Sequence, residues 1–250
     1  MKKEEIYVKS SLDGSLQPSL FFKAEGERRP LLVGLHTWSY DRNNQVENLL
    51  PYAQKHNFDL LLPEFRGPNL KSNPHCTEAC GSSYAIADIC DAIKYCCDNY
   101  SSDSERVMLI GLSGGGHMAL LMAGVHPEMF LAVAAAVPIC NLSDWVEENG
   151  NYAPHVLACC SDSREEMEKR SPASYISGLA KSNTKIFHGK YDSCVPVSQS
   201  IKLYMKTLEE YPKSRLFLDI FDGGHQIDMH EAMYWLLSQY ERREKIAVTG

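Results

Sequence analysis

The sequence predicts an α/β protein in which helices flank a mostly parallel sheet. Two observations support this class. Short apolar segments alternate along the chain with longer segments of helical periodicity, and such alternation implies right-handed crossovers between parallel strands. The chain has 250 residues, of which 44% are hydrophobic, and this size suits one large core. We therefore expect residues 1–250 to form a single domain.

The elements can be placed in chain order. Residues 5–9 and 19–24 predict antiparallel strands at one edge of the sheet. The later elements are, in order, a strand at 31–36, a helix at about 44–56, a strand at 58–63, a helical segment at 85–93, strands at 106–110 and 131–137, a strand from 184, and a strand at 215–221. A long loop rich in Pro, Asn and Gly is expected between Glu64 and Cys80.

The most informative local pattern is Gly-Leu-Ser-Gly-Gly at residues 111–115. An apolar strand-like run precedes it, and a helical pattern follows at once. This layout is typical of a nucleophile elbow, in which glycines around the serine avoid Cβ clashes in a sharp strand-to-helix turn. The alternative is a glycine-rich turn that cradles a phosphate. A P-loop is excluded because no Gly-Lys-Ser/Thr follows, but the glycines alone do not exclude a dinucleotide-binding turn.

A serine nucleophile needs a general base, and the base needs an acid that orients it. Asp192 follows the strand that begins at 184, and His225 follows the strand at 215–221. With Ser113, both residues lie just beyond the C-terminal ends of predicted parallel strands, where open α/β sheets bind ligands. Taken separately, Asp192 could be a turn or helix-cap residue and His225 a helix N-terminal residue. The order serine, aspartate, histidine favours a catalytic triad.

With these motifs in place, the chain resembles an α/β-hydrolase, specifically the catalytic domain of the prolyl oligopeptidase family and related esterases. The resemblance extends from about Leu20 to Tyr240, and it is carried by residues 111–115, 188–192 with Val195-Pro196, 223–225, 170–172 and 35–37. It implies an eight-stranded, mostly parallel α/β-hydrolase sheet with a small lid insertion. It also implies that Ser113, Asp192 and His225 are the catalytic residues.

Acyl transfer also requires two hydrogen-bond donors for the developing oxyanion. One is expected to be the backbone N–H of Gly114, the residue after the nucleophile. The other is expected from the loop at 36–41. The family has glycine where Thr37 stands, so the second donor could be the amide of Thr37 or of Trp38. We favour Trp38 by alignment with the family's loop.

Two segments are expected to shape specificity. Residues 141–170 lie where hydrolases often insert a lid, and Trp145 within them could line a substrate pocket; a solvated helical connection is an equal alternative. The loop at 63–80 should rim the site, with Glu64 in contact with a charged or sugar substrate. An ion pair that braces this loop is at least as plausible a role for Glu64. Thr37 is a further candidate for substrate binding.

Composition excludes several classes of partner. The net charge of −7 argues against nucleic acids and anionic membranes, and no apolar run reaches membrane-spanning length. The polar start lacks a signal-peptide core, which predicts a cytoplasmic protein. Nine cysteines, an odd number, suit reduced thiols. His75, Cys76 and Cys80 lack a second ligand pair at zinc-finger spacing, so we predict neither a metal nor another cofactor.

Three functions fit these observations. We favour a serine hydrolase of small acyl or aryl esters, such as acetylated or feruloylated saccharides. The second is an oligopeptidase on short peptides; relatives that restrict access carry an N-terminal propeller, and too few residues precede Leu31 to form one. The third is a non-catalytic binding protein on the same scaffold. The expected partner is thus a small ester or short peptide, and the sequence leaves the oligomeric state open.

Overall fold

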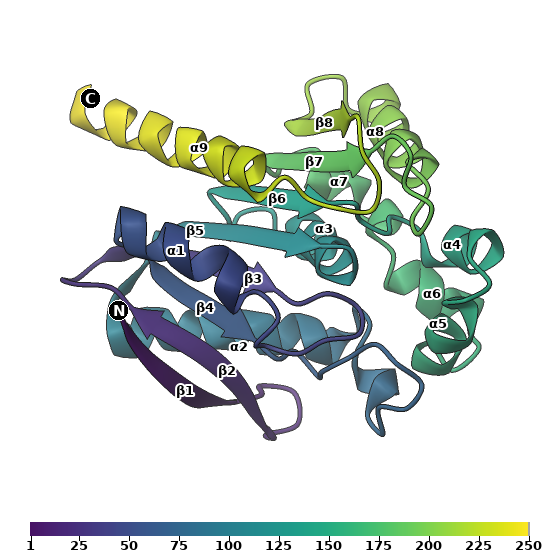
Figure 1. The fold of residues 1–250 in the computed structure, drawn as a ribbon, viewed down its shortest axis with the longest axis horizontal. Helices are drawn as coiled ribbons and strands as arrows, with labels where there is room; N and C mark the ends of the chain where they lie inside the picture. Colours follow the sequence, from purple (N-terminus) through teal and green to yellow (C-terminus); the bar gives the residue numbers. More distant parts are fainter. Residues whose placement is uncertain (250) are drawn as a thin grey trace.

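An eight-stranded sheet runs through the computed structural model, which describes residues 1–249 and places side chains up to Lys245 (Figure 1). The spatial order is β1-β2-β4-β3-β5-β6-β7-β8. β1 pairs antiparallel with β2, and β2 with β4, whereas the remaining pairs are parallel. The mostly parallel sheet predicted from sequence is therefore confirmed. The strands are β1 Lys2–Lys9, β2 Leu16–Lys23, β3 Arg29–Leu35, β4 Asp59–Pro63, β5 Ser102–Leu112, β6 Ala132–Ala136, β7 Thr184–Gly189 and β8 Leu216–Phe221.

Helices cover both faces of this sheet. Those of the described chain are α1 Val46–His56, α2 Ser83–Tyr100, α3 Gly114–Val125, α4 Leu142–Glu148, α5 Ala153–Cys159, α6 Arg164–Lys169, α7 Ile176–Leu179, α8 Ser198–Glu210 and α9 Met229–Thr249, with 3₁₀ turns η1 Cys76–Glu78 and η2 Pro172–Ser174. α2, α3, α7 and α8 pack on one face, and α1 and α9 pack on the other. Burial on both faces explains why the central strands are continuous apolar runs.

β5 illustrates how strand periodicity divides the core. Val107 and Leu109 point into the cluster under α2 and α3, whereas Met108 and Ile110 point into the cluster under α1 and α9. Successive side chains of a strand face opposite sides, so one apolar run supplies both layers. The strand is longer than predicted because Ser102 and Asp103 also pair with the start of β3, before a bulge that precedes Val107.

The segment at 141–170 folds as three short helices, α4, α5 and α6, which lie beyond the carboxyl ends of the strands (Figure 1). Their buried side chains form a third apolar cluster with residues from three other loops. Its buried members are Trp38, Cys80, Ile139, Leu142, Trp145, Val156, Cys159, Cys160, Met167 and Val195. We refer to this set as the cap cluster. It joins the 141–170 segment to the loops that surround Ser113.

The 85–93 segment with helical periodicity is part of a longer helix, α2, which runs from Ser83 to Tyr100. Ser82 caps its start by accepting the backbone N–H of Ala85. The additional turns extend the core contact through Cys96, which is fully buried. Within residues 1–249, no helix combines the length and the apolar character needed to cross a bilayer.

Close packing of α7 against α3 leads to a stability prediction. A Cβ at Gly178 would overlap the backbone carbonyl of Gly124, so Gly178→Ala should lower the unfolding free energy by about 1–3 kcal/mol. Thermal unfolding measures the change, with Gly150→Ala as the matched control because a Cβ at Gly150 would have no other atom within 4 Å. An unchanged transition in Gly178→Ala would contradict this packing.

Candidate active site

The turn at Ser113 is a strained strand-to-helix connection. Ser113 has φ 57° and ψ −116°, a region that residues with a Cβ seldom adopt. Two hydrogen bonds hold it: its N–H donates to Ala136 O at 2.9 Å, and its carbonyl accepts the N–H of His117 at 2.8 Å. A Cβ on Gly115 would lie 2.5 Å from Leu35 O. The glycine thus lets α3 approach β3 closely enough to make the turn.

Three side chains that are distant in sequence meet at this turn. His225 Nε2 lies 2.9 Å from Ser113 Oγ, and His225 Nδ1 donates to Asp192 Oδ2 at 2.7 Å. Ser113 follows β5, Asp192 follows β7 and His225 follows β8, so all three lie at the carboxyl edge of the parallel strands. The structure therefore brings together the three residues singled out from the sequence. In this geometry the imidazole can take the proton of the serine hydroxyl.

Asp192 is held as a carboxylate. Its Oδ1 accepts the backbone N–H groups of Cys194 and Val195, both at 2.8 Å. Burial would raise the pKa of Asp192, but hydrogen bonds from His188, His225 and the Val195 amide outweigh it and keep the pKa well below its ordinary value. A permanently charged acid can orient and stabilise a protonated His225.

His188 also contacts the Asp192 carboxylate and the loop that holds it. Its Nε2 donates to Val195 O at 2.8 Å and lies 3.5 Å from Asp192 Oδ2, while its Nδ1 contacts Ser200 Oγ at 2.7 Å. The side chain is fully buried. The sequence gives no signal for the contact between His188 and Asp192, because residues four apart in a turn leave no periodic pattern.

The environment of His225 raises the pKa of its imidazole. Burial by itself would lower the pKa, but the hydrogen bond to Asp192 and a contact with the Cys194 thiol outweigh it, and the pKa rises to about 9. The Cys194 thiol also contacts the Tyr152 hydroxyl. Cys194 thus lies beside His225, a position that only the folded loop reveals.

The two candidate oxyanion amides lie side by side. A Cβ on Gly114 would sit 2.6 Å from the backbone nitrogen of Trp38, so the two chain segments are in direct contact. The Thr37 N–H donates to the Asn44 side chain at 3.0 Å. Within the described chain the Trp38 N–H has no such acceptor, and Gly114 begins α3, where the first amides have no intrahelical partner. Asn44 had no sequence signal for this role.

The residues expected to bind substrate make structural contacts. Glu64 accepts hydrogen bonds from the Arg42 side chain at 2.8 Å and from the Arg42 N–H at 3.2 Å. Trp145 is 1% exposed, packs edge-on against Trp38 with ring centroids 5.0 Å apart, and donates through Nε1 to Cys194 O. Thr37 is half-buried and its N–H is engaged by Asn44. In this conformation these groups brace the loops around Ser113.

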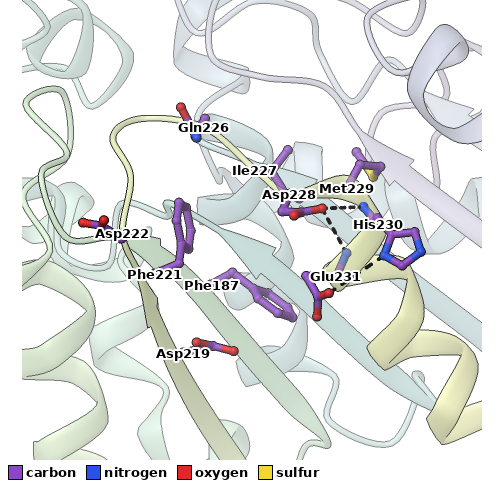
Figure 2. A pocket seen from close by; sticks show the side chains of 10 residues that line it. All are labelled: Phe187, Asp219, Phe221, Asp222, Gln226, Ile227, Asp228, Met229, His230 and Glu231. Carbon is purple, nitrogen blue, oxygen red and sulfur yellow. Dashed lines mark hydrogen bonds and ion pairs between the residues drawn. The ribbon is translucent and has the colours of Figure 1, made fainter.

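A concavity of about 680 Å³ adjoins the His225 loop on the side of α9 (Figure 2). Phe187 and Phe221 form one side of it, and Asp228, Met229 and Glu231 form the other. Neither Ser113 nor Asp192 lines this space. This concavity therefore adjoins the His225 loop without including the Ser113 turn.

The sheet topology, the strained serine turn and the Ser113–His225–Asp192 hydrogen bonds define the class: this protein is a serine hydrolase with the α/β-hydrolase fold. Its family follows from a match between residues 81–241 and the model of the prolyl oligopeptidase family. The chain belongs to that family.

Individual relatives include both peptidases and esterases. The acylamino-acid-releasing enzyme of Arabidopsis thaliana is 24% identical over 246 residues, which is 92% of this chain and 31% of that protein. Acylaminoacyl peptidase from Pyrococcus horikoshii has a TM-score of 0.73 and 20% identity, covering 90% of this chain and 37% of that one. Acetyl xylan esterase from Paenibacillus sp. R4 has a TM-score of 0.69 and 19% identity, and the match covers 94% of this chain and 83% of that one. The two structures share the fold, and the chain spans about a third of the length of the curated relatives it matches.

The raised pKa of His225 predicts the pH dependence of turnover. A protonated imidazole cannot accept the Ser113 proton, so kcat/KM for an ester should increase with pH, with a midpoint above the ordinary histidine value of 6.5 and towards about 9. Stopped-flow pH profiles of kcat/KM measure this midpoint, and a midpoint below 6.5 would contradict the assignment.

Asp192→Asn should lower kcat by about 10⁴-fold and also lower the His225 pKa. Stopped-flow kinetics measures the loss of kcat, and NMR titration of the imidazole measures the pKa.

Proposed function

We propose that the protein is a carboxylic-ester hydrolase of small acyl or aryl esters, in which Ser113 is the nucleophile, His225 the general base and Asp192 the residue that orients it. The observation that supports these roles best is the continuous hydrogen-bonded line from Ser113 Oγ through His225 to Asp192, at 2.9 and 2.7 Å. Acetylated or feruloylated saccharides are the substrate class we favour.

The reaction has two halves. Ser113 Oγ attacks the ester carbonyl while its proton moves to His225 Nε2. The protonated imidazole, stabilised by Asp192, then gives this proton to the leaving alkoxide, and an acyl-serine remains. In the second half water attacks the acyl carbonyl, His225 accepts the water proton, and the carboxylic acid leaves as Ser113 is regenerated.

We propose that the N–H groups of Gly114 and Trp38 stabilise the oxyanion of both tetrahedral intermediates. Two observations support the choice of Trp38 over Thr37: the Thr37 amide is engaged by Asn44, and the Trp38 nitrogen lies against Gly114. Fixed backbone donors need little reorganisation as the negative charge develops. Trp145 and Glu64 then act as supports, Trp145 by packing on Trp38 and Glu64 by pairing with Arg42.

Neutral ester substrates suit the charges at the rim of the site. Glu64 is paired with Arg42, and Arg66 is paired with Asp13, Glu78 and Asp88. Glu64 and Arg66 are thus already paired within the protein and do not offer a free charge to a peptide terminus. We further propose that α4–α6 act as a cap over the acyl group, because the cap cluster joins them to the Trp38 loop.

An acylaminoacyl or dipeptidyl peptidase is the second candidate. The observation that favours it is the alignment of 92% of this chain with the acylamino-acid-releasing enzyme of Arabidopsis thaliana. The proposed Ser113, His225 and Asp192 machinery serves both reactions, since amides and esters pass through similar tetrahedral intermediates. The two candidates therefore differ in the preferred leaving group, which is measurable.

One assay tests the nucleophile and ranks the substrates. We expect Ser113→Ala to remove nearly all turnover of p-nitrophenyl acetate and butyrate, and to abolish labelling by a fluorophosphonate. For the unmodified protein we expect higher kcat/KM on these esters than on N-acetylalanyl and dipeptidyl p-nitroanilides. Unchanged turnover by Ser113→Ala would refute the mechanism. Higher kcat/KM on the anilides would make the peptidase the better assignment.

Substitution of Gly114 tests the oxyanion proposal. Gly114→Ala places a Cβ 2.6 Å from the Trp38 nitrogen, so both donors should shift and kcat should fall by about 10²–10³-fold with little change in KM. Trp38→Phe retains the backbone N–H and should lose far less activity. Circular dichroism checks that both variants are folded. Equal losses in the two folded variants would argue against the backbone amide of Trp38 as the donor.

A further inference from the structure

Four of the free cysteines gather from two segments outside the triad. Cys76 begins η1 and Cys80 follows it in the rim loop, while Cys159 ends α5 and Cys160 is the next residue. Cys80, Cys159 and Cys160 are buried in the cap cluster, and the partly exposed Cys76 packs against it. Because η1 lies against α5, the two pairs of thiols face each other across the contact between these segments.

These thiols are close enough to affect one another. Interactions with Cys159 and Cys160 raise the pKa of the Cys80 thiol, and burial together with an interaction with Cys159 raises the pKa of the Cys76 thiol. Arg170 fixes the backbone on both sides of this contact. Its guanidinium donates to the carbonyls of Thr77 at 3.1 Å, Ala79 at 3.2 Å and Cys159 at 3.0 Å, so rim loop and α5 share one buried cation.

This environment favours the thiolate form of two of the four cysteines. The interaction with the Cys80 thiol outweighs the effect of burial and lowers the pKa of both Cys159 and Cys160, and the positive charge of Arg170 contributes. Peroxides oxidise a cysteine according to its thiolate character and its exposure, and Cys76, which neighbours Cys159, is the partly exposed member of the set. A metal role is less well supported, since within residues 1–249 no group of three His, Cys, Asp or Glu side chains is arranged to hold a metal ion.

We propose that these four cysteines form a dithiol oxidation site, in which hydrogen peroxide joins the 76–80 segment to the 159–160 segment by one disulfide. Cys76 passes its thiol proton to the neighbouring Cys159 thiolate and attacks a peroxide oxygen; the O–O bond breaks, a sulfenic acid forms on Cys76, and the released hydroxide takes the proton from Cys159 to give water. The Cys159 thiolate then attacks the sulfenic sulfur of Cys76, and the displaced hydroxide takes up one proton to leave as a second water. Two thiols are oxidised and one peroxide is reduced to two waters.

Exposure decides where the oxidant enters. Cys80, Cys159 and Cys160 are at most 1% exposed, whereas Cys76 is partly exposed, so the peroxide reacts first at Cys76. The pairing also has to cross the two segments. Cys159 and Cys160 are adjacent in sequence, and closing a bond between neighbours would strain the intervening peptide.

The cross-link is coupled to the proposed oxyanion hole through Asn69. The Cys80 N–H donates to Asn69 Oδ1 at 2.8 Å, and the Asn69 N–H donates to Trp38 O at 2.7 Å. Closing a thiol contact to the S–S length of about 2.05 Å requires one segment to move. Movement of Cys80 would shift Trp38 through Asn69, and we expect a several-fold lower kcat in the oxidised protein. This consequence for turnover rests on the proposed function, whereas disulfide formation does not.

The test compares two adjacent cysteine pairs. The full chain is treated with hydrogen peroxide, and peptide mass spectrometry locates any cross-link through its loss of two hydrogen atoms. In the unmodified protein we expect a link between segments 76–80 and 159–160, a several-fold lower kcat/KM on p-nitrophenyl acetate, and recovery of both with dithiothreitol. Cys159→Ser/Cys160→Ser should show neither change. The matched control Cys96→Ser/Cys97→Ser, which alters an adjacent pair on α2, should behave like the unmodified protein.

The outcomes separate this proposal from the proposed function. A protein that remains fully reduced, or one that links other cysteines, overturns the oxidation site. Inhibition that persists in Cys159→Ser/Cys160→Ser would arise at Cys194 beside His225 and overturns the coupling to Trp38, as does a cross-link without a change in kcat/KM. If the reduced protein hydrolyses no ester, the esterase proposal fails while the cross-link can still be measured by mass.

Discussion

The constraint on which the site depends is the close approach of α3 to the sheet at the Ser113 turn. Ser113 occupies a backbone conformation that costs about 1–3 kcal/mol for a residue with a Cβ. The surrounding glycines make that conformation possible, because a Cβ at Gly111 would overlap the carbonyl of Gly115 and one at Gly115 would press on Leu35 O. The packing of α3, whose residues 114–124 are all buried, holds this strained conformation in place.

The shared edge at which the parallel strands end brings the candidate catalytic groups together. Parallel strands end at one edge of the sheet, so residues that follow β5, β7 and β8 meet although more than a hundred positions separate Ser113 from His225. Gly114 then touches the Trp38 loop after β3. The candidate nucleophile, base and acid and the two candidate donors thus come from four loops at one edge, which follow β3, β5, β7 and β8.

The cap cluster links this edge to the 141–170 helices. Trp38 packs on Trp145, and Trp145 donates to the carbonyl of Cys194 in the loop that holds Asp192. Packed aromatic rings and one hydrogen bond to a backbone carbonyl therefore connect the cap to both the acid loop and the Trp38 loop. The four cysteines of the proposed oxidation site lie in or against the same cluster.

The sequence alone determined the α/β class, the strand order along the chain and the triad candidates, because these follow from periodicity and from short motifs such as Gly-Leu-Ser-Gly-Gly. Only the tertiary structure decided which rim charges are paired, that the Thr37 amide is engaged by Asn44, and that Cys80 meets Cys159. Such contacts join positions far apart in the chain, or depend on the conformation of irregular loops. Neither kind of contact leaves a repeating pattern in the order of residues, so the details of the loops around Ser113 came from the fold.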